Sequence, residues 1–161
     1  MNEGLPNYKF ALREDLKTNK EFLPKQSEPD ATGYDVRCAQ TDGVVLTHGG
    51  IFKIPLGFRV YCPDGWWLEL NPRSSTFLKR ELITLVGIID QSFPGEVHLV
   101  GKFLSNTQKF NKIEFGDLIG QLVPYKLQRM NIEESTNEEL DLLIKNRNSK
   151  RTGGFGSTGV K

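Results

Sequence analysis

Short apolar segments recur along almost the whole chain, and this pattern limits the possible folds more than any other feature of the sequence. The segments are rich in Val, Ile, Leu, Phe and Tyr and are bounded by Gly, Pro, Asp or Asn, as is typical of β-strands joined by turns. They are YKFALR, YDVRCA, GVVLTH, GIFKIPLGFRVYC, WWLELNP, LITLVGIID, GEVHLVGKFLS and LIGQLVPYKL. Their regular spacing within 161 residues predicts a single all-β domain, a barrel or a sandwich.

One segment near the C-terminal end departs from this pattern. ESTNEELDLLIKNRN begins with two hydroxyl residues that can cap a helix, each followed three residues later by a glutamate, as in a capping box. Leu140, Leu143 and Ile144 then recur at the spacing of one helical face. The segment predicts one short helix near residues 136–146, inside an insert of about residues 133–148.

Charge balance and the length of the apolar runs argue against two classes of partner. The chain has 21 basic and 20 acidic residues, so its net charge of +1 gives no large basic field for nucleic acid. No apolar run approaches the roughly 20 residues that cross a membrane, and MNEGLPNYKF lacks the core of a signal peptide. Cys38 and Cys62 form no CxxC pair and are predicted to be reduced core thiols. We therefore expect a cytoplasmic protein with no nucleic-acid or membrane partner.

Four stretches carry more polar groups than turns between strands require. They are TGYD with Asp35, NPRSS with Arg73, Ser74 and Ser75, GIIDQSFPGEV with Asp90, and the glycine-rich end TGGFGSTGVK, which Lys150 and Arg151 precede. Each stretch alone also fits an ordinary turn, loop or frayed terminus. Taken together, two anion-binding sets and two carboxylates favour a nucleoside triphosphate with a divalent cation. GxxxxGK[ST] is absent, and the one GxGxxG match, GFGSTG (154–159), follows no predicted strand, so neither a P-loop nor a Rossmann protein is indicated.

In their order along the chain, these stretches resemble the five motifs of the trimeric, all-β dUTP pyrophosphatases (dUTPases). The counterparts are ATGYDV (31–36), PRSS (72–75), VGIIDQSFPGEV (86–97), GDLIGQLV (116–123) and GGFGSTG (153–159). The resemblance implies a jelly-roll-like β barrel in residues 1–149, which carries the helical insert. It also implies a homotrimer with sites between subunits, and a flexible glycine-rich tail, residues 150–161, that acts as a mobile lid.

The resemblance further implies hydrolysis of dUTP to dUMP and pyrophosphate with Mg²⁺, which lowers dUTP and supplies dUMP for thymidylate synthesis. Asp90 matches the aspartate that activates the attacking water, and Asp35 matches the one that supports the metal through water. The other matches are substrate-binding positions: Arg73, Ser74, Ser75 and Gln121 for the phosphates, backbone groups of Thr84, Ile88, Ile89 and His98 for uracil, Phe93 for deoxyribose, and Lys150, Arg151, Phe155, Gly156, Ser157 and Thr158 in the lid.

Three positions depart from the family pattern. Phe93 stands where tyrosine is usual, which keeps the packing against the sugar and loses a hydroxyl. Ser75 stands where the second motif usually has glycine, so it keeps the N–H and adds bulk beside the phosphates. Lys150 stands where the fifth motif usually has arginine, and Arg151 follows it, so either cation can neutralise the γ-phosphate.

Two other functions stay open at this point. A dCTP deaminase has the same barrel, an RSS-like stretch and an ID-x-x-[aromatic]-x-G pattern. That enzyme needs a glutamate about ten residues after the aspartate, where this chain has Val100, and no acid lies between Glu96 and Glu114. The second alternative is a dUTP-binding regulatory protein that engages a partner through the predicted helix.

Overall fold

The structure is a computed structural model, and it describes residues 4–147. The elements are β1 (Lys9–Leu12), the 3-10 helices η1 (Glu14–Leu16) and η2 (Lys20–Phe22), β2 (Tyr34–Arg37), β3 (Val44–Thr47), β4 (Ile51–Pro55), β5 (Phe58–Tyr61), β6 (Trp66–Pro72), α1 (Ser74–Leu78), β7 (Leu82–Thr84), β8 (Gly87–Ile89), β9 (His98–Phe103), β10 (Phe110–Ile113), β11 (Leu118–Lys126) and α2 (Asn137–Lys145). The chain divides into two compact units after Gln128. The first unit holds every strand, and the second holds α2.

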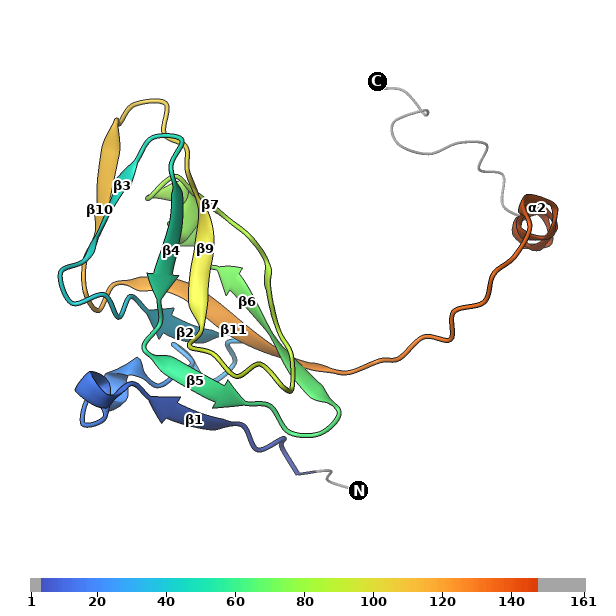
Figure 1. Ribbon diagram of the computed structural model, residues 1–161, viewed down its shortest axis with the longest axis horizontal. Coiled ribbons are helices and arrows are strands. Elements are labelled where there is room, and N and C mark those ends of the chain that lie inside the picture. Colours follow the sequence, from blue (N-terminus) through green and yellow to red (C-terminus); the bar gives the residue numbers. More distant parts are fainter. Residues whose placement is uncertain (1–3, 148–161) are drawn as a thin grey trace. The chain divides into compact units, whose positions relative to one another are not determined.

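The strands of the first unit form four antiparallel sheets (Figure 1). Their strand orders are β1-β5, β10-β3, β4-β9-β7 and β2-β11-β6-β8. This arrangement confirms the predicted all-β class. Among the described residues the sheets do not close into a continuous barrel, because the hydrogen-bonded ladders are interrupted where the chain passes from one sheet to the next.

One core lies beneath all four sheets. The strands of the four-stranded sheet alternate between buried and more exposed side chains, as the two-residue period of a strand requires. In β6, Leu68 and Leu70 are buried, whereas Trp67, Glu69 and Asn71 lie on the opposite face. The remaining core comes from the facing strands, including Phe52, Ile54, Phe58, Leu99 and Phe103. Both cysteines are free and buried, as predicted.

Two apolar stretches that the sequence presents as continuous are each divided into two strands. LITLVGIID forms β7, which pairs with β9, and β8, which pairs with β6 in another sheet. GIFKIPLGFRVYC forms β4 and β5, and Gly57 between them has a φ of 77°. A side chain at Gly57 would also approach within 2.3 Å of Leu16. The chain changes direction there because glycine alone fits the backbone and the contact.

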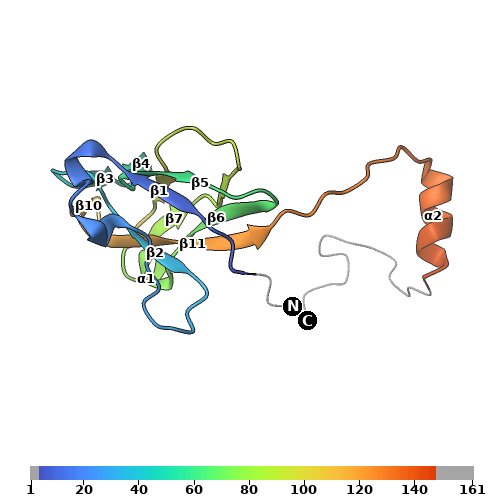
Figure 2. The same ribbon diagram turned by 90° about the horizontal axis from the view of Figure 1, so that it is seen from below.

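The predicted helix is present as α2 in the second unit (Figure 2). Thr136 accepts a hydrogen bond from the Glu139 N–H, and the Glu139 carboxylate accepts one from the Thr136 N–H, so the capping box forms with Thr136 as its N-cap. The hydrogen bond from the Thr136 N–H, followed by one from the Ser135 hydroxyl, lowers the pKa of Glu139. Leu140, Leu143 and Ile144 are exposed. None of the helices described is long and apolar enough to cross a membrane.

Gly101 in β9 provides a test of how tightly the sheets are packed. A Cβ at this position would lie 2.2 Å from Ile83 O, 2.7 Å from Phe52 Cζ and 2.8 Å from Thr84 Cα. Because backbone atoms cannot rotate away, we expect Gly101→Ala to lower the free energy of unfolding by about 1–3 kcal/mol. Urea denaturation measures the change. Gly4→Ala is the control, since nothing lies within 4 Å of its Cβ position. Equal stability of the two variants would contradict the close packing.

Candidate functional site

Three of the predicted motifs meet on the outer face of the four-stranded sheet. Gln121 in β11 pairs with Asp35 in β2 on one side and with Asn71 in β6 on the other. Directly paired residues of antiparallel strands project to the same face, so these side chains form one row. Arg73 lies two residues beyond Asn71, and its Nε is 2.9 Å from Asp35 Oδ1. The register therefore brings together residues that are far apart in the sequence.

Two features position Gln121 in this row. They are a hydrogen bond to the backbone carbonyl of Pro72 and the space left by the missing side chain of Gly33. Gln121 Nε2 donates a hydrogen bond of 3.1 Å to Pro72 O. A Cβ at the buried Gly33 would lie 2.2 Å from Gln121 Oε1. A side chain at Gly33 would therefore displace the amide of Gln121 from its present position.

Ser74 and Ser75 begin α1 rather than lying in an irregular loop. Arg73 precedes the helix with an extended backbone, at φ −80° and ψ 156°. Thr76 is fully buried, and its hydroxyl donates a hydrogen bond of 2.9 Å to Ile119 O in β11. This bond fixes the short helix to the sheet and so positions the two serines. Sequence reasoning missed Thr76 because a threonine after PRSS carries no distinct signal.

Asp90 lies near the other end of the same sheet. It follows the buried Ile89, which pairs with Leu68, and its own side chain is exposed. The turn after it is closed by a hydrogen bond of 3.1 Å from Phe93 N to Asp90 O. A buried strand end and a closed turn therefore present the carboxylate to solvent.

A cavity of about 750 Å³ lies beside Asp90. Its lining includes Trp67 and Tyr125, whose rings are stacked with centroids 4.9 Å apart. Burial raises the pKa of the Cys62 thiol, and the negative charge of Asp90 raises it further. The cavity therefore has one aromatic wall and one carboxylate.

The residues predicted to recognise uracil lie on three strands, β7, β8 and β9. Ile88 and Ile89 are in β8, and His98 begins β9, but β8 and β9 belong to different sheets. Thr84 lies at the end of β7, and its buried Oγ1 is the side-chain atom for which no hydrogen-bond partner is found within residues 4–147. Such an atom calls for a water or a ligand.

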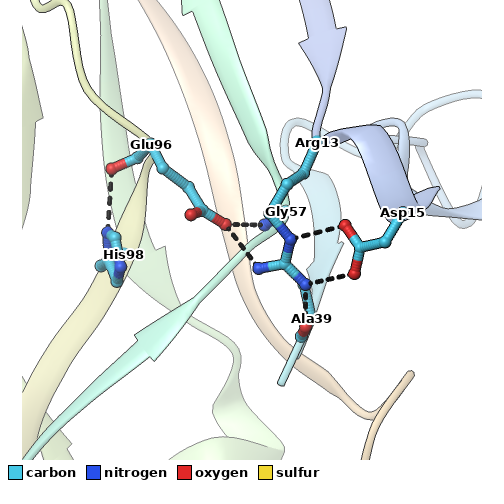
Figure 3. Close-up of polar contacts among 6 residues, drawn as sticks. All are labelled: Arg13, Asp15, Ala39, Gly57, Glu96 and His98. Carbon is cyan, nitrogen blue, oxygen red and sulfur yellow. Dashed lines mark hydrogen bonds and ion pairs between the residues drawn. The ribbon is translucent and has the colours of Figure 1, made fainter. Parts of the chain in front are cut away.

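A polar network fixes the start of β9 (Figure 3). Glu96 Oε1 accepts hydrogen bonds from Gly57 N at 2.9 Å and from Arg13 Nη1 at 3.1 Å. His98 Nδ1 lies 2.9 Å from Glu96 O, and because a carbonyl only accepts, Nδ1–H is the donor. Arg13 also pairs with Asp15, which raises the pKa of Arg13. Sequence reasoning missed Arg13 and Glu96 because their pairing depends on long-range contact.

Phe93 is partly exposed and lies against a glycine. A Cβ at Gly95 would lie 3.2 Å from Phe93 Cζ, so the ring packs over the backbone there. The remaining predicted residues, namely Lys150, Arg151, Phe155, Gly156, Ser157 and Thr158, lie outside the described residues.

The structure does not bring Asp90 and Arg73 of one chain together. Trp67, in the wall of the Asp90 cavity, and Arg73 are separated by six residues along β6. At about 3.3 Å per residue, these positions are roughly 20 Å apart. The two halves of the predicted site therefore lie at opposite ends of one sheet face.

The carboxylates of the described residues supply few of the ligands that a metal ion would need from the protein. Among residues 4–147, no group of three or more His, Cys, Asp or Glu side chains is arranged to hold an ion. Asp35 is engaged by Arg73. Mg²⁺ commonly keeps several waters and binds through one or two carboxylates and substrate phosphates. This donor set fits an ion that would be held mainly by a polyphosphate.

Comparison with known proteins gives a consistent result. The sequence model of the dUTPase family matches residues 19–159. A deoxyuridine 5'-triphosphate nucleotidohydrolase from Debaryomyces hansenii is 32% identical over 158 residues, which cover 98% of this chain and 93% of the relative. The dUTPase of Streptococcus mutans superposes with a TM-score of 0.67 at 27% identity, covering 76% of this chain and 98% of that one. The Staphylococcus bacteriophage 80alpha dUTPase with dUPNHPP shares the fold, with a TM-score of 0.73 at 19% identity and coverages of 96% and 99%.

Thr76 tests whether the hydroxyl bond to β11 fixes the serine-bearing helix. Thr76→Val keeps the shape of the side chain but leaves Ile119 O without its donor. We expect a loss of about 1–3 kcal/mol in the free energy of unfolding. Chemical denaturation measures it, with the same change at the exposed Thr41 as the control. A loss at Thr76 no larger than that at Thr41 would show that the bond contributes nothing.

Proposed function

Because the chain belongs to the dUTPase family, we propose that it hydrolyses dUTP to dUMP and pyrophosphate, with Asp90 as the general base. The observation that carries the proposal is the placement of Asp90, an exposed carboxylate on a closed turn at the edge of a cavity. A carboxylate in this position can hydrogen-bond a water molecule and accept its proton.

The proposed reaction is an in-line displacement at the α-phosphorus. Asp90 orients the water and takes one of its protons as the new bond from oxygen to the α-phosphorus forms. The bond from the α-phosphorus to the bridging oxygen of the β-phosphate breaks, and its electron pair stays on that oxygen. The products are dUMP and pyrophosphate. Such a transfer requires mainly positioning and charge neutralisation from the protein.

The site is completed by a second copy of the chain. Asp90 serves the α-phosphate, whereas Arg73, Ser74, Ser75 and Gln121 serve the phosphates on either side of the scissile bond. Neighbouring phosphates share a single bridging oxygen, so the two sets must lie within a few ångström of each other. In one chain they are separated by roughly 20 Å of β6. A homotrimer, as in the family that the motifs resemble, lets one protomer supply Asp90 and another supply Arg73.

Mg²⁺ fits this arrangement as a cation bound to the triphosphate. Its contribution when bound is to neutralise charge on the phosphate oxygens and to hold the triphosphate in one conformation. Asp35 would support the ion through its waters. The ion pair between Asp35 and Arg73 keeps that carboxylate beside the guanidinium that binds phosphate.

We assign base recognition to the end of β7, to β8 and to the start of β9, within residues 84–98. Ile88 and Ile89 are the last two residues of β8 and His98 begins β9, where the network of Glu96 and Arg13 holds the backbone in place. Fixed backbone donors and acceptors distinguish uracil from cytosine, because a mismatched base leaves buried groups unpaired. Thr84 contributes its backbone at the same edge.

Sugar recognition and closure complete the proposal. Phe93, held over Gly95, packs beneath the deoxyribose and leaves no room for a 2′-hydroxyl. Phe155 stacks on the base as the tail closes, while Lys150 or Arg151 with Gly156, Ser157 and Thr158 binds the γ-phosphate.

Replacing Asp90 tests the assignment of the general base. We expect Asp90→Asn to lower kcat at least about a hundredfold, because the amide cannot accept the proton. Binding of the non-hydrolysed substrate should persist, since the change keeps the size of the side chain. Pyrophosphate release measures kcat and calorimetry measures binding. Near-normal turnover would rule out the assignment.

A substrate panel tests the chemistry and its specificity. With Mg²⁺, we expect pyrophosphate release from dUTP and little from dCTP, dTTP or UTP, because backbone groups of residues 84–98 read the base and Phe93 reads the sugar. Ammonia release from dCTP is measured in parallel, since a deaminase of the same fold would produce it. Equal rates with dTTP or UTP would contradict the proposed recognition.

Mixed oligomers test whether the site is shared. Asp90→Asn and Arg73→Ala chains are co-expressed with different tags, and particles that carry both tags are purified. Each variant alone should be inactive. A cyclic mixed trimer contains one site with both native residues, so its activity should reach about one third of the wild-type value. Failure to recover activity would mean that both residues act within one chain.

A further inference from the structure

A second cavity, of about 590 Å³, lies beyond Arg73 on the side of the sheet that carries α1. It is lined by Arg37, Arg73, Ser75, Lys79, Arg80, Gln108, Asn111, Gly116, Asp117 and Leu118. Leu118 is its one large apolar side chain, and no aromatic ring is among these residues. The lining therefore suits a small polar ligand rather than a nucleobase.

The cations of this cavity are only partly neutralised. Arg80 pairs with Asp117 at 3.0 Å, and Arg73 pairs with Asp35 at 2.9 Å. Arg37 donates to two carbonyl oxygens, to Gly116 O at 2.8 Å and to Glu21 O at 3.2 Å, and these bonds do not cancel its charge.

Lys79 forms no ion pair or side-chain hydrogen bond with any residue in the part of the chain that the structure describes. Two positive charges thus remain at the cavity, although the whole chain has a net charge of only +1. Such a concentration of charge in a polar cavity attracts a compact polyanion.

We propose that this cavity binds the leaving pyrophosphate, with Arg37 and Lys79 as its additional ligands. The proposal rests on the proposed function, since Arg73 and Ser75 belong both to the phosphate-binding set and to this cavity. Arg37 directly follows the ATGYDV stretch and Lys79 lies four residues after PRSS, so neither is a motif residue.

The position of the cavity explains why pyrophosphate is the preferred ligand. When the bond to the α-phosphorus breaks, the β- and γ-phosphates remain against Arg73 and Ser75. Arg37 and Lys79 line the same cavity as Arg73 and Ser75 and do not line the cavity beside Asp90, and the amides of Gln108 and Asn111 offer further donors. Arg37 and Lys79 therefore bind the departing group rather than the nucleoside, and they affect product release.

The test is calorimetric binding of pyrophosphate to the full chain in the absence of dUTP. We expect Lys79→Gln and Arg37→Gln each to weaken binding about three- to tenfold at low salt, because each removes a charge-assisted contact. The double variant should lose more than either single variant. The losses should shrink as salt rises, since the charges are partly exposed.

Two further measurements separate this role from a structural one. Inhibition of turnover by added pyrophosphate should weaken by the same factor, whereas inhibition by dUMP should not change. Lys9→Gln and Arg59→Gln are the controls, since they remove the same charges from β1 and β5, which do not line the cavity. Lys79 makes no side-chain bond within residues 4–147, so its variant is expected to fold even where Arg37→Gln disturbs the Gly116 contact.

Three results would each overturn the proposal. They are equal pyrophosphate affinity in Lys79→Gln and the wild type, equal losses of affinity in the controls, and no binding at millimolar pyrophosphate. The outcome also separates this site from the proposed activity. Pyrophosphate binding that depends on Lys79 in a chain that does not hydrolyse dUTP would refute the activity and keep the anion site. If the chain hydrolyses dUTP but its pyrophosphate binding does not depend on Lys79, the activity is kept and the anion site is refuted.

Discussion

The pairing of β11 with β2 on one side and with β6 on the other is the interaction on which the rest of the site depends. Backbone hydrogen bonds fix this register, which places Asp35, Gln121 and Asn71 in one row. Asp35 in this row positions Arg73 through their ion pair, and β11 positions α1 through the hydrogen bond from the Thr76 hydroxyl to Ile119 O. A slip of one residue would turn the whole row toward the core, so the hydrophobic pattern that buries Leu122 also determines the polar face.

The register of β11 gathers residues of the proposed site, whereas the division of LITLVGIID into β7 and β8 separates two of them, Asp90 and Arg73. β8 pairs with β6 near Leu68, far along the strand from Arg73. Asp90 and Arg73 are thereby fixed at opposite ends of a rigid sheet, and no local movement of a side chain can bridge them. A site shared between copies, as proposed above, fits this geometry of the strands.

Charge in this protein is organised locally. The near-neutral total excludes a broad basic surface, yet four cationic side chains gather around one cavity where carboxylates neutralise two of them. A local charge pair also acts at the start of β9, where Glu96 and Arg13 hold the backbone segment that is proposed to read the base. In both places, side chains outside the five motifs, namely Arg13, Arg37 and Lys79, contact or extend a set of motif residues.

The sequence by itself determined the all-β class, most strand positions, the α2 capping box and the identity of the family, because these depend on local periodicity and on ordered short motifs. WWLELNP became β6, and the segment from Leu118 became β11, almost as the pattern predicts. The tertiary structure alone decided that PRSS begins a helix, that LITLVGIID crosses between sheets and that Arg37 and Lys79 face one cavity. It also separated Asp90 from Arg73 within one chain. Strand partners and ion pairs join residues tens of positions apart, and their energies depend on distances that local sequence patterns do not contain.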